Sequence, residues 1–226
     1  MVGNILIDHM ILNEEKLTSK QVRDHTIAFM FAYEVYASGV SNMLLLLAMN
    51  TDVQQKCADE IMKVFPQNKT FDPVKINELP YLDMVTKEAF RLLPAIPLVL
   101  RQTLDDFKLT PELEVPKGVD FVINLFALHR RKDIWGEDAD KFNPDNFLPE
   151  NVAKRHSHSY LPFSGGQRNC LAYKYTMTLL KISLAKLLTA YQFSTTMKMK
   201  DIRIKSYVSM KLCTPHSVSI QKRIKS

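Results

Sequence analysis

The longest hydrophobic stretch of the chain, residues 26–49, reads TIAFMFAYEVYASGVSNMLLLLAM. Apolar residues on every side of a helix are typical of a membrane span or of a central helix inside a large core. Glu34 interrupts the stretch, and an acidic side chain at a bilayer centre costs about 2.5–3.5 kcal/mol. We therefore expect a buried central helix, with Thr18 or Ser19 as its cap. The alternative is a small membrane protein that spans at residues 26–49.

Two amphipathic helices are predicted after this stretch. Following a cap at Thr51 or Asp52, apolar side chains recur about every fourth residue until Pro66 ends the helix. The segment LPYLDMVTKEAFRLLP then predicts a helix over residues 80–93, bounded by prolines.

Beyond these helices the pattern changes to short alternating runs broken by proline and glycine, which indicates strands and turns. Residues 126–162 are polar but contain aromatic residues that favour burial, so we expect an ordered meander. A further helix is predicted over residues 171–191, and alternating strands over residues 192–226. Together the elements predict a single domain that is mainly α with small β-sheets.

The net charge of +6 is concentrated near the C-terminus. From Leu171 onward the chain has 11 lysines and arginines against one acidic residue, Asp201. A basic segment of this kind suits nucleic acid, an anionic membrane or an acidic protein partner, or is simply a solvated surface.

The three cysteines lie far apart, without zinc-type spacing, so we expect neither a disulfide framework nor a zinc site. The first residues lack the pattern of a signal peptide, so we expect no signal sequence in this chain.

The stretch LPFSGGQRNC ends at Cys170 and leads into the helix predicted over residues 171–191. Unpaired backbone N–H groups at a helix N-terminus stabilise a thiolate, and Arg168 adds a positive charge. Gly165 and Gly166 let the backbone approach a flat ligand closely. A lone thiolate without a positioned histidine base favours a metal that brings its own equatorial ligands, as haem iron does. A buried cysteine beside a turn is the alternative.

The same stretch resembles the cysteine loop of the cytochrome P450 family, F-x-x-G-x-R-x-C-x-G. Phe163, Gly166, Arg168 and Cys170 match this pattern, whereas Ser164 stands where the family has a glycine. The resemblance implies haem b as the cofactor, with Cys170 as the axial ligand of its iron. It also implies that Arg168 pairs with a haem propionate.

Three more motifs follow the family's order. Glu88 and Arg91 match the E-x-x-R helix motif, which implies a buried structural pair. The stretch PLVLRQT resembles the family's segment after this helix, which implies that Arg101 reaches the second propionate. A guanidinium suits this task because it binds a carboxylate with two parallel hydrogen bonds. In the block KFNPDNF, Asn146 replaces the family's arginine, which is expected to weaken its charged triad with the E-x-x-R pair.

On the central helix, Glu34 matches the family's acidic residue for proton delivery. Val35 replaces the threonine that the family uses in the same task, and it cannot donate a proton. Tyr36 or Ser38 is a candidate substitute.

The resemblance implies the C-terminal, haem-binding portion of the P450 fold, with the N-terminal half and its membrane anchor missing from this chain. The wording of the meander is most similar to insect members allied to the fatty-acid-hydroxylase branch.

The implied function is a monooxygenase, in a truncated form, that inserts one oxygen atom from O2 into a lipophilic molecule such as a fatty acid, hormone or xenobiotic. Electrons would come from NADPH through a flavoprotein reductase docked on a basic surface near Lys174, with no nucleic-acid partner. A full-length form would lie on the cytosolic face of the endoplasmic reticulum membrane. A non-catalytic remnant of the fold is the alternative.

Overall fold

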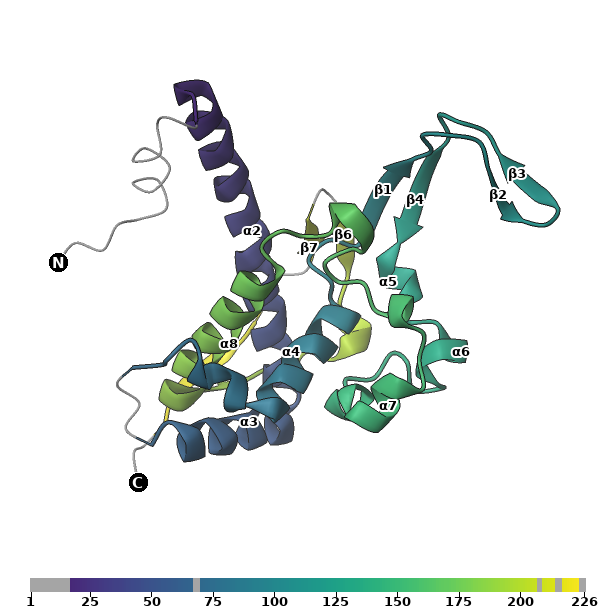
Figure 1. Cartoon of the computed structure of the whole chain (residues 1–226). Coiled ribbons are helices and arrows are strands. Elements are labelled where there is room, and N and C mark those ends of the chain that lie inside the picture. Colours follow the sequence, from purple (N-terminus) through teal and green to yellow (C-terminus); the bar gives the residue numbers. More distant parts are fainter. Residues whose placement is uncertain (1–16, 67–69, 207–208, 214–216, 224–226) are drawn as a thin grey trace.

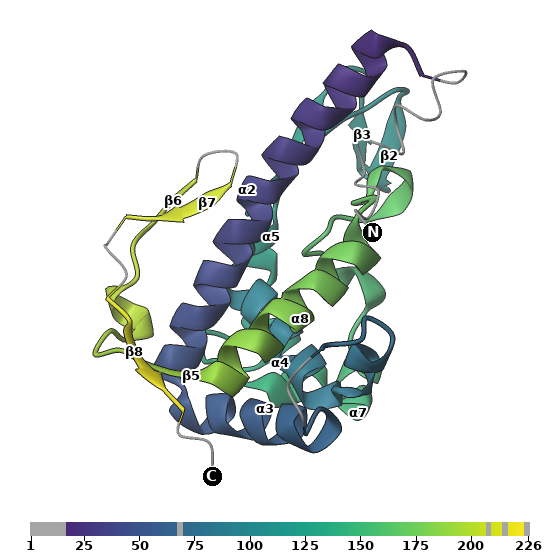
Figure 2. The ribbon, with the colours of Figure 1, turned by 90° about the vertical axis from the view of Figure 1, so that its left-hand side faces the viewer.

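A computed structural model of the chain describes residues 17–66, 70–206, 209–213 and 217–223. Its long helices are α2 (Ser19–Met49), α3 (Thr51–Val64), α4 (Pro80–Leu92) and α8 (Tyr173–Ala190). In Figures 1 and 2, α2 and α8 lie side by side and α3 crosses beneath them. The fold is mainly α with small β-sheets, as the sequence predicts.

The strands pair into two-stranded antiparallel sheets, β1 with β4, β2 with β3, β5 with β8 and β6 with β7. Their bounds are β1 (Leu98–Gln102), β2 (Phe107–Thr110), β3 (Leu113–Val115), β4 (Asp120–Asn124), β5 (Tyr191–Ser194), β6 (Ile204–Ser206), β7 (Met210–Leu212) and β8 (Ser219–Lys222).

Short helices make up the rest of the regular structure. They are α5 (Leu125–Leu128), α6 (Lys132–Trp135), α7 (Pro149–Ala153), and the 3₁₀ helices η1 (Lys75–Glu78), η2 (Pro144–Phe147), η3 (Ser157–Ser159), η4 (Gly166–Arg168) and η5 (Met199–Asp201).

Helix α2 begins where its sequence signals place it. Thr18 caps it through a reciprocal pair of hydrogen bonds with Gln21. The next helix differs from expectation, because Asn50 rather than Thr51 or Asp52 is its N-cap, without a side-chain hydrogen bond.

The expectation that the whole of residues 26–49 is buried is wrong for the first half of this segment. The buried residues of α2 run from Gly39 onward, whereas Ile27, Met30 and Tyr33 are 58%, 71% and 67% exposed. The reason is that α4, α8 and β5 pack on the second half, so the first turns project beyond the described core. By length and composition α2 could cross a membrane, but its second half is packed inside this protein.

The core is formed by apolar faces of the four long helices. Gln54 links them to the C-terminal strands, since its side-chain amide donates to Phe193 O and accepts from Phe193 N, both at 2.9 Å. The fully buried core side chains include Leu46, Leu47, Cys57, Ile61, Leu82, Val85, Leu180 and Leu184.

The polar stretch before the cysteine loop is ordered around an aromatic cluster, as its composition suggests. Trp135 and Phe147 are buried, with 6% and 7% of their surface exposed. Tyr160 packs against both rings, and its hydroxyl donates to Lys87 O (2.8 Å), which ties the meander to α4.

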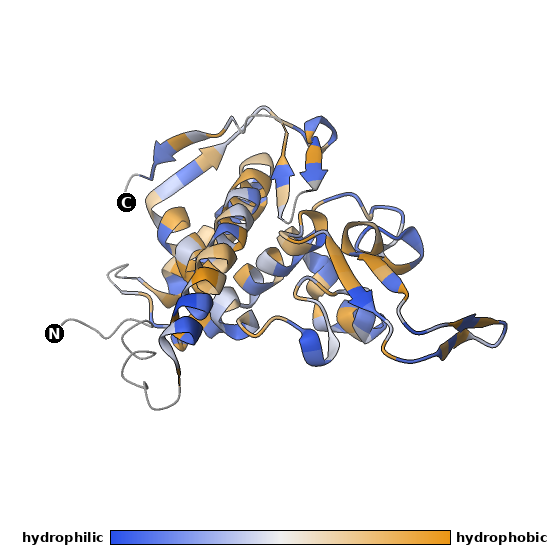
Figure 3. Ribbon diagram, turned by 90° about the horizontal axis from the view of Figure 1, so that it is seen from above, coloured by the Kyte–Doolittle hydropathy of each residue, from blue (hydrophilic) through white to orange (hydrophobic). Residues whose placement is uncertain are grey.

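Figure 3 shows hydrophobic and hydrophilic residues alternating along the projecting β2–β3 hairpin. Phe107, Leu109 and Leu113 on this hairpin are exposed. The hairpin therefore contributes little to the core.

Candidate haem site

A fully buried ion pair on α4 joins this helix to the segments that precede the cysteine loop. Glu88 and Arg91 are three residues apart, so they share one face of the helix, and both side chains are 0% exposed. Arg91 donates from Nε and Nη2 to the two carboxylate oxygens, each at 2.7 Å. Its other N–H groups donate to the carbonyl oxygens of His129, Ala139 and Lys141. All five donors of the guanidinium are thus used, and α4 is held to two other segments, at residue 129 and at residues 139–141.

The Glu88 carboxylate accepts two more hydrogen bonds, from Asn143 N (2.8 Å) and from Asn146 Nδ2 (3.2 Å). Burial raises the pKa of the Glu88 carboxyl, and these four hydrogen bonds counteract the shift because they favour the ionised form. Asn146, which replaces the family's arginine, therefore still contacts the pair. Asn146 is itself contacted by a cation, because the Arg155 guanidinium donates to Asn146 O. The same guanidinium stacks on Trp135, with 4.3 Å between Arg155 Cζ and the ring centroid.

His129 connects this support to the cysteine loop. It is fully buried, and its Nε2 accepts a hydrogen bond from Leu161 N (2.9 Å). Because Nε2 accepts, the proton of the neutral ring is on Nδ1, which has no partner among the described residues. Burial lowers the pKa of His129 to about 3, helped by the nearby cations of Arg91 and Arg130.

The cysteine loop is closed by its own backbone. A turn is formed where Ser164 N donates to Leu161 O (3.0 Å), and Cys170 N donates to Phe163 O (2.9 Å). Two residues of the loop have a positive φ, Ser164 at 64° and Gly166 at 76°. The loop thus folds into a compact ring that ends at the sulfur, just before α8 begins.

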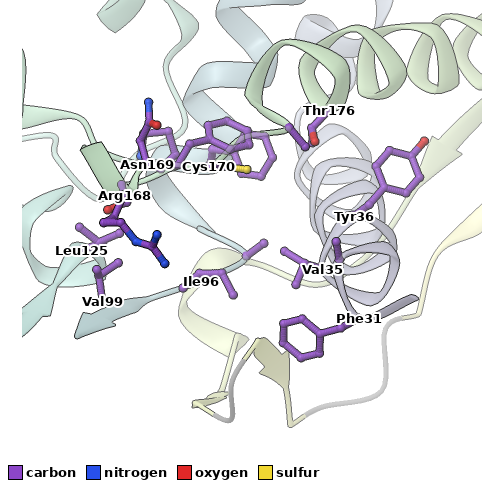
Figure 4. A pocket seen from close by; sticks show the side chains of 17 residues that line it. Phe31, Val35, Tyr36, Ile96, Val99, Leu125, Arg168, Asn169, Cys170 and Thr176 are labelled. Carbon is purple, nitrogen blue, oxygen red and sulfur yellow. The ribbon is translucent and has the colours of Figure 1, made fainter. Parts of the chain in front are cut away.

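Helix α2 and the cysteine loop face one another across an apolar cavity of ≈ 310 Å³. Figure 4 shows Phe31 and Val35 of α2 on one side and Cys170 with Arg168 on the other. The remaining lining residues are Ala32, Tyr36, Phe90, Ala95, Ile96, Val99, Leu125, Pro162, Phe163, Ser164, Asn169, Ala172 and Thr176.

Of the predicted cofactor residues, Phe163, Arg168 and Cys170 line this cavity, whereas Gly166 and Arg101 do not. The Phe163 ring packs between Phe90 and Tyr173, at 5.2 and 4.9 Å between centroids. Arg168 lines the cavity directly. Arg101 stands one layer further out, because its Nη2 donates to the Ser164 hydroxyl (2.7 Å) and that serine lines the cavity.

The residues predicted for proton delivery are not brought together. Glu34 is not among the cavity-lining residues; it pairs with Lys211 on β7 (2.9 Å), and the hydrogen bond from Lys211 lowers the pKa of its carboxyl. The Tyr36 hydroxyl is 2.6 Å from the Ser183 hydroxyl on α8, and the Ser38 hydroxyl donates to Met210 O. Of these four residues, Val35 and Tyr36 line the cavity, and Val35 has no hydroxyl to donate a proton.

The cavity fits haem in its chemistry. Apolar side chains on two opposed walls suit a flat hydrophobic ring, and Cys170 on one wall supplies the soft ligand that iron accepts. Arg168 and the Arg101–Ser164 pair place cationic and hydroxyl groups at one side, which suits carboxylates. Among the described residues there is no competing cluster of His, Cys, Asp or Glu that could hold a metal ion.

Three contributors to the site have no signal in the motifs. His129 accepts from Leu161 N, 32 residues along the chain, and Arg155 donates to Asn146 O, and neither hydrogen bond is indicated by a motif. In the sequence, Ser164 is only a serine where a glycine is expected. The structure shows that this position has a positive φ, a conformation that favours glycine.

Comparisons with known proteins agree with this geometry. The model of the family described as cytochrome P450 matches residues 3–220. Probable cytochrome P450 313a4 of Drosophila melanogaster is 37% identical over 97% of this chain and 45% of its own length. Cytochrome P450 4A10 of Mus musculus is 32% identical over 84% of this chain and 37% of its own length.

The crystal structure of a cytochrome P450 (CYP102L1) has a TM-score of 0.87 to this fold at 25% identity. The similarity covers 98% of this chain and 51% of that chain, so the chain corresponds to a part of the fold. The chain spans less than half the length of the Drosophila and mouse relatives. The family match, the relatives and the placement of Cys170 on the cavity lead to one conclusion: the chain belongs to the cytochrome P450 family.

Proposed function

We propose that this chain provides the thiolate-bearing half of a haem monooxygenase, which inserts one oxygen atom from O2 into a lipophilic small molecule. The observation that carries the proposal is the cavity between α2 and the cysteine loop. These elements are more than 100 residues apart in the chain, yet they enclose an apolar space with Cys170 on its wall.

Cys170 would ligate the iron, and Arg168 and Arg101 would neutralise the haem carboxylates. Haem, when bound, supplies the redox chemistry of oxygen activation. The protein's own contribution is to exclude water with side chains such as Phe31 and Val35, and to keep the lipophilic substrate in an apolar space.

The partners belong to the proposal as well. Lys174 is exposed in the first turn of α8, beside the fully exposed Leu171 and the 70% exposed Tyr175. This mixed basic and apolar surface on the thiolate side suits an acidic flavoprotein reductase that carries electrons from NADPH. The apolar cavity suits a lipophilic substrate, and we propose a fatty acid, hormone or xenobiotic. For a full-length form we propose the cytosolic face of the endoplasmic reticulum membrane as the location.

The assignment of Cys170 is tested by titrating the full 226-residue chain with haem and recording the spectrum of the reduced, carbon-monoxide-treated sample. We expect the red-shifted Soret band that thiolate ligation produces, and a band at shorter wavelength for Cys170→Ser, because a serine oxygen donates less electron density. Cys213→Ser is the matched control, since Cys213 is also a free, exposed thiol but does not line the cavity. Identical spectra for the two variants would refute Cys170 as the ligand.

A non-catalytic remnant of the fold is the second candidate. It is favoured by Val35, which has no hydroxyl, and by the engagement of Tyr36 with Ser183. In that case the chain would bind haem weakly or not at all, and the titration would develop no absorbance of a haem–thiolate complex.

A further inference from the structure

Ser164 occupies a backbone conformation that favours glycine. Its φ of 64° lies in the left-handed region, where a side chain crowds the backbone and glycine does not. Strained residues of this kind cluster where the side chain has a task. Gly166, two residues further on, has a similar positive φ and is a glycine. A glycine at position 164 would adopt the same backbone without crowding, so the backbone alone gives no reason for a serine there.

The Ser164 hydroxyl accepts a hydrogen bond but donates none to the residues that the structure describes. Its oxygen accepts the hydrogen bond from Arg101 Nη2 (2.7 Å), and a hydroxyl also has one proton to donate. None of the residues described by the structure accepts that proton, and Ser164 lines the cavity. A hydroxyl that accepts from a cation is polarised and becomes a stronger donor.

The polar groups near Ser164 define what it would bind. Arg168 lines the same cavity, and Arg101 reaches it through Ser164 itself. The Arg168 guanidinium and the polarised Ser164 O–H, in a mainly apolar lining, are complementary to a carboxylate attached to a hydrophobic body.

We propose that Ser164 is a carboxylate-binding residue, whose hydroxyl donates to a haem carboxylate while Arg101 holds it in place. This inference rests on the proposed function, because it takes haem as the group bound beside Cys170. It also gives Arg101 an indirect role, as the residue that orients and polarises Ser164.

The test measures affinity by absorbance titration of the full chain with haem and with haem dimethyl ester, in which both carboxylates are esterified. Ser164→Gly should bind haem about tenfold more weakly than the natural chain, since a hydrogen bond to a charged group is lost. The difference between the two proteins should be smaller for the dimethyl ester, because an uncharged ester carbonyl accepts a weaker hydrogen bond than a carboxylate does. In the haem-free state Ser164→Gly should melt at a higher temperature than the natural chain, because glycine relieves the positive φ.

Two variants serve as controls. Ser164→Ala lacks the hydroxyl but keeps the side-chain crowding, so it should lose haem affinity as Ser164→Gly does, without the gain in melting temperature. Thr176→Val removes another hydroxyl from the cavity lining and should leave the ratio of haem to ester affinity unchanged.

The outcomes separate the two proposals. If the natural chain binds haem and Ser164→Gly binds it as tightly, the role of Ser164 is overturned while the haem site stands. If the natural chain binds neither haem nor its ester, both proposals fall. A fatty-acid substrate also has a carboxylate, so the haem-loaded chain is titrated with dodecanoate. A loss of dodecanoate affinity in Ser164→Gly, with haem affinity intact, would overturn the assignment to haem.

Discussion

Arg91 uses every donor of its guanidinium, so its removal tests the support beneath the cysteine loop. Arg91→Ala leaves the Glu88 carboxylate buried without its cation and frees three carbonyl oxygens. We expect the free energy of unfolding to fall by about 3–5 kcal/mol, measured by urea denaturation. Arg131→Ala is the control, because its ion pair with Asp133 is solvent-exposed and should contribute nothing measurable. Equal losses in both variants would contradict the structural role of Arg91.

The lowered pKa of His129 makes the free energy of unfolding depend on pH. Its pKa is lowered to about 3 in the folded chain by burial and by neighbouring cations, against about 6.5 when unfolded. Below pH 6.5 the unfolded chain therefore binds a proton that the folded chain does not. Stability from this group is complete above about pH 6.5 and is lost as pH falls toward 3, at up to about 1.4 kcal/mol per pH unit.

The measurement is a series of urea denaturations between those pH values. His129→Gln should have a shallower decline, because its side chain does not titrate while its amide oxygen can still accept from Leu161 N. His158→Gln, at an exposed position, should decline as the natural chain does. A decline that persists unchanged in His129→Gln would assign it to other groups.

Val35 bears on proton delivery in an active full-length form. The Tyr36 hydroxyl is already engaged with the Ser183 hydroxyl, and the Ser38 hydroxyl with Met210 O. Val35→Thr is close to isosteric and puts a hydroxyl on the cavity wall. We expect more oxygenated product and less hydrogen peroxide per NADPH consumed. An unchanged product-to-peroxide ratio would show that another donor, such as an ordered water, already delivers protons.

At the scale of elements, α2 divides into two halves with different surroundings. Met30 is 71% exposed on its first half, together with Ile27 and Tyr33 at helical spacing, whereas Leu46 is fully buried on its second half. A contiguous apolar face of this kind promotes self-association.

Met30→Glu should therefore lower the self-association of the chain in sedimentation experiments and leave its melting temperature unchanged. Leu46→Glu, the same change in the buried half, should unfold the chain because it buries a charge. Loss of stability in Met30→Glu would mean that the first half of α2 is covered in solution.

At the scale of the whole molecule, the cavity joins segments that are distant in sequence. α2, the start of β1 and the cysteine loop contribute to one lining, so a ligand there contacts all of them only when the chain is folded. Haem added at 100 times its dissociation constant should raise the free energy of unfolding by about 2.7 kcal/mol.

The rise is measured as a concentration-dependent increase in melting temperature. Cys213→Ser should match the natural chain, since this residue lies outside the cavity lining. Haem binding without any gain in stability would indicate attachment to unfolded chain or to the surface.

The sequence by itself determined the features that depend on neighbours along the chain. Prolines flank α4, and a Thr18 capping box starts α2, because helix ends are set by local hydrogen bonding and backbone sterics. Glu88 and Arg91 meet because three residues separate them on one helix. Cys170 and Arg168 lie in one loop because only two positions separate them in the sequence. The family's motifs are short segments of this kind.

Only the tertiary structure decided which faces meet. Glu34 was expected to deliver protons, yet it pairs with Lys211, because β7 packs near that side of α2. Arg101 and Ser164 are 63 residues apart in the chain, and their hydrogen bond depends on how β1 approaches the cysteine loop. Hydrophobic periodicity indicates that a helix has an apolar face. Which part of that face is covered depends on how the other elements pack. This is why the exposure of Met30 and the burial of Leu46, within one apolar stretch, could not be read from the sequence.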